Sequence, residues 1–209
     1  METKYIVNNA RGQTINGNVT INGGLTITGD TSIRPYKVYT ALLTQSGGDG
    51  YIELNSGELT IGVTYRIEGG VRESDFTNVG APNNEVGTSF VATGTTPASW
   101  GINEGFGAIL SYNTGAPVVT VLENTIGNVW FTYSQPGNYR INSNSLFIGG
   151  KTFCQGMTYT AEDGTSFFVA TLTRNTNSRV DLSIASPISE TSFDNLLSFD
   201  TPIEIRVYN

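Results

Sequence analysis

Hydrophobic residues recur every six positions near the beginning of the chain, between residues 11 and 34. A glycine lies two residues after each of the first three isoleucines of this repeat. The period is typical of short extended segments that each point one isoleucine inward and turn at a glycine. The apolar positions of the repeat are Ile15, Val19, Ile21, Leu25, Ile27 and Ile33.

Three copies of this hexapeptide repeat are too few to form a folded unit within one chain. A single coil has no neighbour to stack on, and its strand edges would remain unpaired. Three chains wound around a threefold axis solve both problems, because each isoleucine then packs against its two symmetry mates. We therefore expect residues 11–34 to form an intertwined, β-helix-like trimerisation stalk. The alternative is a flexible, glycine-rich linker whose period is accidental.

After residue 34 the pattern changes to short stretches rich in β-branched and aromatic residues, separated by clusters of Gly, Asn, Asp and Pro. Short strands at this spacing predict an all-β fold with an antiparallel β-sandwich. Residues 47–50 are predicted to be a tight hairpin turn, and residues 73–78 and 190–197 are candidates for helical turns. The predicted strands are 36–44, 59–67, 87–93, 107–112, 118–123, 128–133, 137–142, 151–153, 157–160, 166–173, 179–184 and 203–208.

The composition excludes several classes of chemistry. The 209 residues contain no His and a single Cys, Cys154, which we expect to be a small, buried or half-buried side chain. Histidine-based nucleophile systems, His-ligated metals, internal disulfides and Cys-rich metal sites are therefore excluded. The formal net charge of −7, with only 11 Lys and Arg, argues against binding to nucleic acid or to an anionic membrane. We expect no metal and no cofactor.

Carboxylates and aromatic rings are the remaining candidates for chemistry. The Asp and Glu residues are scattered without a motif, so we expect no enzyme; a pair of carboxylates that faces across a cleft, as in a glycosidase, is the alternative. Aromatic faces stack on pyranose rings, and Trp100 in a turn-rich stretch is the candidate glycan-binding residue. Trp130 follows a strand pattern that favours the core. The aromatic residues considered for a sugar surface or for the core are Trp100, Tyr112, Trp130, Tyr133, Tyr139 and Tyr159.

The chain has no stretch near the roughly 20 apolar residues that a membrane helix needs, and its first residues have no signal-peptide pattern. We therefore expect a protein that folds in a cytoplasm. Residues 1–10 are polar except around Tyr5, Ile6 and Val7, and they suit an extended tail that orders on docking to a partner. The alternative is a disordered terminus.

Two separated segments, residues 37–47 and 116–127, resemble the two halves of one sequence phrase in structural proteins of tailed bacteriophages, including crAss-like phages of Bacteroidetes. In those proteins the halves are often nearly adjacent, and residues 201–208 resemble the last strand of the same group. The intervening residues 62–97 resemble a second small β module of similar phage proteins. The resemblance implies an outer β domain, formed by residues 35–50 and 115–209, with an inserted β module at about residues 51–114.

The resemblance implies a protein of the virion surface, assembled in the host cytoplasm, and the expected trimeric stalk suits a fibre of this kind. We expect a homotrimeric head fibre or capsid spike whose residues 1–10 bind the major capsid protein or another virion protein. Residues 35–209 would then project outward and adhere to host-surface glycans. One alternative is a small tail fibre or baseplate receptor-binding protein whose module at residues 51–112 recognises the host. A polysaccharide depolymerase is a further alternative.

Overall fold

The computed structural model describes residues 23, 34–70, 73–101, 107–160, 167–186 and 200–209. The chain divides into two units, residues 1–34 and 35–209, and the fold is that of the second unit. The predicted trimerisation stalk and the predicted anchor around Tyr5, Ile6 and Val7 lie outside the described residues. The predicted helical turn at 190–197 also lies outside them.

The described part of the chain is all-β, and its paired strands run antiparallel, as predicted. It contains no helix long and apolar enough to cross a membrane. The strands are β1 (Tyr36–Gln45), β2 (Tyr51–Leu54), β3 (Thr64–Gly69), β4 (Ser74–Asp75), β5 (Ser89–Val91), β6 (Ser99–Trp100), β7 (Ile109–Asn113), β8 (Pro117–Asn124), β9 (Val129–Gln135), β10 (Asn138–Ser143), β11 (Thr152–Gln155), β12 (Thr158–Thr160), β13 (Phe167–Thr176), β14 (Arg179–Ala185) and β15 (Thr201–Tyr208).

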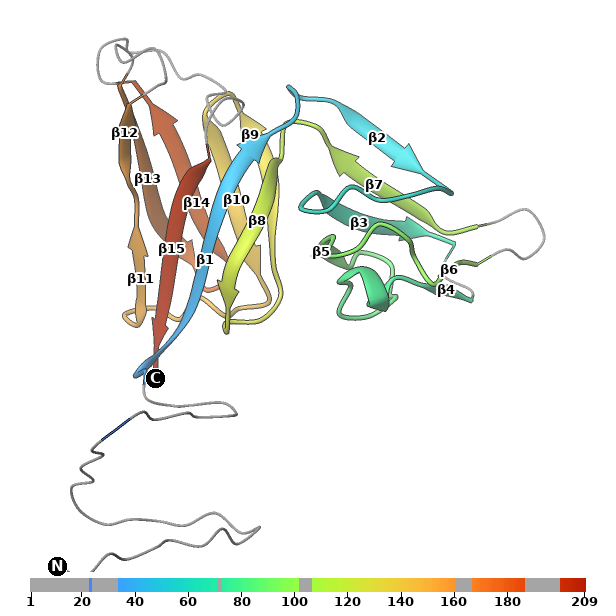
Figure 1. The fold of residues 1–209 in the computed structure, drawn as a ribbon, viewed down its shortest axis with the longest axis horizontal. Coiled ribbons are helices and arrows are strands. Elements are labelled where there is room, and N and C mark those ends of the chain that lie inside the picture. Colours follow the sequence, from blue (N-terminus) through green and yellow to red (C-terminus); the bar gives the residue numbers. More distant parts are fainter. Residues whose placement is uncertain (1–22, 24–33, 71–72, 102–106, 161–166, 187–199) are drawn as a thin grey trace, which may run out of the picture. The chain divides into compact units, whose positions relative to one another are not determined.

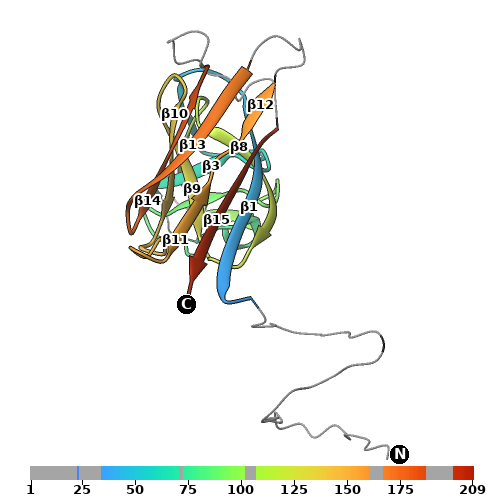
Figure 2. The same ribbon diagram turned by 90° about the vertical axis from the view of Figure 1, so that its left-hand side faces the viewer.

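Two of the sheets form a β-sandwich. One has the strand order β11-β15-β1-β8 and the other the order β12-β13-β14-β10-β9, and Figures 1 and 2 show them face to face. In β1 the buried residues alternate from Tyr39 to Gln45, as expected for a strand with one face on a core. Its neighbour β15 alternates in the same way, from Thr201 to Val207.

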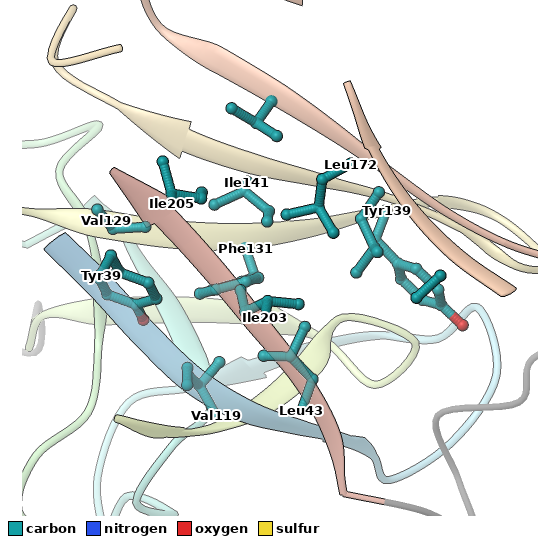
Figure 3. Close-up of a cluster of buried hydrophobic side chains, with 14 of the residues drawn as sticks. Tyr39, Leu43, Val119, Val129, Phe131, Tyr139, Ile141, Leu172, Ile203 and Ile205 are labelled. Carbon is teal, nitrogen blue, oxygen red and sulfur yellow. The ribbon is translucent and has the colours of Figure 1, made fainter. Parts of the chain in front are cut away.

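The two inner faces share one hydrophobic core. Tyr39, Leu43 and Ile205 come from the first sheet, and Phe131 and Ile141 come from the second. Figure 3 shows these side chains meeting between the sheets. Phe131, Ile141 and Leu43 are fully buried, so this core supplies most of the apolar burial that stabilises the sandwich.

The described residues between 51 and 113 form a second structure with its own core. Strands β2, β7, β3 and β5 make a four-stranded sheet in that order, and β4 and β6 pair beside it. Tyr65, Ile67, Phe90 and Leu110 are buried in a separate hydrophobic cluster. Phe76 joins this cluster with no exposed surface, and its ring stacks on Phe90 with centroids 6.4 Å apart.

Backbone contacts connect this second structure to the sandwich. The carbonyl oxygen of Gly62 accepts a hydrogen bond from the backbone N–H of Val119 in β8, at 2.9 Å. A Cβ at Gly62 would lie 2.6 Å from the Val119 carbonyl oxygen, and the residue has a φ of +86°. Only glycine satisfies both conditions without strain, so the close approach of the two chain segments depends on it.

The structure corrects two local predictions. Residues 47–50 are not a hairpin turn, because β1 pairs with β15 and β8 whereas β2 pairs with β7 in another sheet. Residues 73–78 are helical only at their end: Glu73 has a φ of +58° and Ser74 and Asp75 pair with β6, whereas the short 3-10 helix η1 (Thr77–Val79) begins at Thr77. Phe76 and Val79 are buried in the second core.

Every predicted strand overlaps an observed strand, so the alternation of apolar and polar residues predicted these elements well. Three short strands were missed, namely β2, β4 and β6. β4 and β6 have two residues each, too few for any periodic pattern. β2 has no buried residue to mark it.

Candidate functional site

The chain passes between the two structures twice, and the two crossing segments lie against each other. Thr114 is central to this contact: its hydroxyl donates to the carbonyl oxygen of Gly48 at 2.6 Å, and its backbone N–H donates to that of Gly50 at 2.8 Å. The Asn113 side chain donates to Asp49 at 2.7 Å. These bonds hold the end of β7 and the beginning of β2 in one place and position the groove beside them.

A groove of about 300 Å³ opens at this junction. Its walls come from β2, β3, β5 and β7 on one side and from β9 of the sandwich on the other. Most of its lining side chains are tyrosines or carry hydroxyl, amide or paired charged groups. The lining residues are Tyr51, Thr64, Tyr65, Arg66, Glu68, Ser89, Ser111, Tyr112, Asn113, Ala116, Phe131, Thr132 and Tyr133.

Two hydrogen bonds tie the opposite walls of the groove together. The hydroxyl oxygen of Thr64 in β3 accepts from the backbone N–H of Phe131 in β9 at 3.1 Å. Asn128, just before β9, donates from its side-chain amide to the carbonyl oxygen of Ser89 at 3.0 Å. Because both bonds cross the junction, the groove is preformed by the packing of the described residues.

Three tyrosines approach the groove from different strands. Tyr112 of β7 packs edge-on against the buried Tyr65, with ring centroids 5.3 Å apart. Tyr133 of β9 packs against Tyr139 in the same manner at 6.0 Å. Tyr51 of β2 is 63% exposed, and its hydroxyl donates to Glu53 at 3.0 Å. The groove therefore has half-buried aromatic rings in its walls and an exposed one at its rim.

A glycine supports the ring of Tyr133. A Cβ added at Gly115 would lie 2.8 Å from Cδ2 and 2.9 Å from Cγ of Tyr133. The backbone N–H of Gly115 donates to Oδ1 of Asn113 at 2.7 Å, and the backbone N–H of Ala116 donates to the carbonyl oxygen of Asn113 at 3.1 Å. This turn brings the backbone under the ring, so the position of Tyr133 depends on the missing side chain.

The charged groups of the groove are paired with each other. One terminal nitrogen of Arg66 donates to both carboxylate oxygens of Glu68, at 3.0 and 2.9 Å. The hydroxyl of Ser111 donates to the same carboxylate at 2.6 Å. Arg66 and Glu68 alternate along β3, so their side chains lie on one face of the strand and reach each other.

The rim phenol is kept in its protonated form. The Ser111 hydroxyl lowers the pKa of Tyr51, but slight desolvation and the neighbouring Glu53 and Glu68 carboxylates together outweigh it, so the pKa lies above its usual value. Tyr51 is therefore a neutral hydrogen-bond donor across the physiological pH range. Among the described residues, no group of three or more His, Cys, Asp or Glu could hold a metal ion.

The structure brings together two of the aromatic residues that the sequence singled out, Tyr112 and Tyr133. Trp100 lies elsewhere: it is half-buried, packs edge-on against Phe76 at 5.4 Å, and donates its indole N–H to the carbonyl oxygen of Gly57 at 3.1 Å. Its ring thus contributes to the second core rather than to the groove.

The other aromatic candidates have different places. Tyr139 is buried, and its hydroxyl donates to Gln45 at 2.7 Å. Trp130 is half-buried and packs against the sandwich core, as predicted. The side chain of Tyr159 lies outside the described residues. Cys154 is half-buried, and burial raises its pKa to about 11.

Sequence reasoning missed Tyr51, Arg66 and Glu68. Arg66 lies in the predicted strand 59–67 and Glu68 directly after it, so their i, i+2 spacing was an available signal for a same-face ion pair. Nothing in the sequence indicated that β2 and β9, which lie far apart in the chain, would face the same groove. A scan of protein-family models finds no match to this chain, and searches of curated proteins and of solved structures find none either.

Proposed function

We propose that this protein is a virion surface fibre, most simply a trimeric head fibre of a tailed bacteriophage, whose β unit adheres to host-surface glycans. The observation that carries the adhesion is the groove at the junction. It combines the rings of Tyr51, Tyr112 and Tyr133 with hydroxyl and amide groups. Sugar rings present an apolar face for stacking and a periphery of hydroxyls for hydrogen bonds, and this lining offers partners for both.

The fibre part of the proposal rests on the hexapeptide repeat, with Ile15, Ile21, Ile27 and Ile33 at equivalent positions. Three copies of a weak site on one trimer bind a glycan-coated surface far more strongly than one copy does, because the second and third contacts form at high effective concentration. The trimer and the groove therefore support the same function. In this proposal residues 1–10 attach the fibre to the capsid.

Binding of the full-length protein to a glycan array tests the adhesion. We expect binding that Tyr112→Ala and Tyr133→Ala each reduce at least about fivefold, if a sugar ring stacked on one aromatic side chain contributes about 1–3 kcal/mol, as a stacked nucleobase does. Phe153→Ala is the matched control, because Phe153 is 44% exposed on a different sheet. Absence of binding to every glycan would refute the adhesion.

Light scattering of the full-length protein tests the trimer. We expect a mass three times that of one chain at micromolar concentration, and Ile21→Asp should reduce it to the mass of one chain. A stable monomer of the unaltered protein would refute the stalk. Electron microscopy of labelled virions distinguishes a head fibre from a tail fibre or baseplate protein, since the label lies on the capsid in the first case only.

A further inference from the structure

The charge arrangement of the groove indicates which class of glycan it accepts. We infer that the groove selects neutral oligosaccharides and rejects sialylated, sulfated or uronic-acid glycans. This inference rests on the proposed function of the groove as a glycan site. It is based on the ion pair between Arg66 and Glu68 in the lining and on two carboxylates beside other lining residues, Glu53 and Asp49.

An anionic sugar is normally held by a guanidinium or ammonium group that is available to its carboxylate or sulfate. Here a nitrogen of Arg66 spans both oxygens of Glu68, and Ser111 donates to the same carboxylate. The Arg66 side chain is 53% exposed, so an anionic ligand could reach it, but it would share the guanidinium with the Glu68 carboxylate and lie beside that negative charge. The pair therefore offers an anionic ligand no net positive charge.

The rim adds negative charge. Glu53 accepts a hydrogen bond from Tyr51, and Asp49 accepts one from Asn113, so each lies directly beside a lining residue. The chain as a whole has a net charge of −7. An anionic sugar entering the groove would therefore approach two further carboxylates, whereas a neutral sugar meets no such repulsion.

Apart from the Arg66–Glu68 pair, the polar groups of the lining are neutral. They include the phenols of Tyr51, Tyr112 and Tyr133 and the hydroxyls of Ser89 and Thr132. Hydroxyl groups both donate and accept hydrogen bonds, so they match the hydroxyls of an uncharged sugar ring. The faces of the tyrosine rings complete the match, because they can stack on the apolar face of the sugar ring.

The test compares matched probes, lactose-terminated and 3′-sialyllactose-terminated glycans, together with neutral oligosaccharides and their sulfated counterparts. We expect the full-length protein to bind the neutral member of each pair at least fivefold more tightly. Glu68→Gln releases Arg66 and removes one negative charge, so it should shift the ratio of anionic to neutral binding upward by at least fivefold. Glu58→Gln makes the same charge change at an exposed residue that does not line the groove, and it should leave the ratio unchanged.

The outcomes separate the two levels of the proposal. Equal or tighter binding of the anionic member by the unaltered protein would overturn the charge selection while leaving the glycan function in place. The same shift in Glu58→Gln as in Glu68→Gln would overturn the role of the Arg66–Glu68 pair. Absence of binding to all probes would overturn the glycan function and this inference with it.

Discussion

The glycine beneath Tyr133 allows a sharp test of how the groove is built. In Gly115→Ala the new Cβ would lie 2.8 and 2.9 Å from two atoms of the Tyr133 ring. This is at least about 0.6 Å inside the ordinary carbon–carbon contact distance of about 3.5 Å. Cγ lies at the root of the side chain, so the ring has to move as a whole away from the backbone. Movement also disturbs its packing on Tyr139.

Two opposing effects set the magnitude. Overpacking of this kind costs about 1–3 kcal/mol. Replacing glycine by alanine lowers the entropy of the unfolded chain and regains about 0.4–1 kcal/mol, because Gly115 has no positive φ. We therefore expect a loss of about 1–2 kcal/mol in the free energy of unfolding. For a unit of this size the loss corresponds to a fall in Tm of about 2–8 °C.

Urea unfolding and differential scanning calorimetry measure this change, and glycan binding should weaken in parallel because the ring lines the groove. Gly48→Ala is the matched control in the other crossing segment, since a Cβ there has nothing within 4 Å. It should be neutral or slightly stabilising. In a Tyr133→Ala background the clash is absent, so Gly115→Ala should cost about 1–3 kcal/mol less than in the unaltered protein. A Tm for Gly115→Ala at or above that of the unaltered protein would refute the reasoning.

Three further predictions concern the rest of the β unit. Tyr139→Phe removes the buried bond to Gln45 and should cost about 1–3 kcal/mol in urea unfolding, because it leaves a buried amide oxygen without that donor; unchanged stability would contradict it. Burial raises the pKa of the Cys154 thiol to about 11. Iodoacetamide at pH 8 should therefore label Cys154 about a hundredfold more slowly in the folded protein than in urea. The labelling rate of the folded protein should rise about tenfold per pH unit up to pH 10. Hydrogen bonds from the Thr77 hydroxyl and backbone, and from Asn84, lower the pKa of Asp75. Its stabilisation is therefore present above the unfolded pKa and is lost as the pH falls through the lower folded value, so Asp75→Asn should flatten the dependence of thermal stability on pH below about pH 4.

The aromatic candidates show how far sequence reasoning reached at the site. Tyr112 and Tyr133 were among the six aromatic residues considered for a sugar surface or for the core, and the groove contains both. Trp100 was selected by the same argument but packs against Phe76 in a core. Residue type identifies which side chains are able to stack on a sugar, but it does not tell which of them face solvent, because that depends on contacts between strands distant in the chain.

The chain's own pattern determined the all-β class and the position of each longer strand, because alternation with period two reports directly which residues of a strand face a core. It also determined the absence of histidine chemistry. The tertiary structure decided which strands pair with one another and which sheets each connecting segment links. Residues 47–50 cross between sheets instead of forming a hairpin, since β1 finds its partners in β15 and β8. It also decided the groove, because Tyr51, Arg66 and Tyr133 meet only when separate sheets pack together, and local periodicity contains no information on that packing.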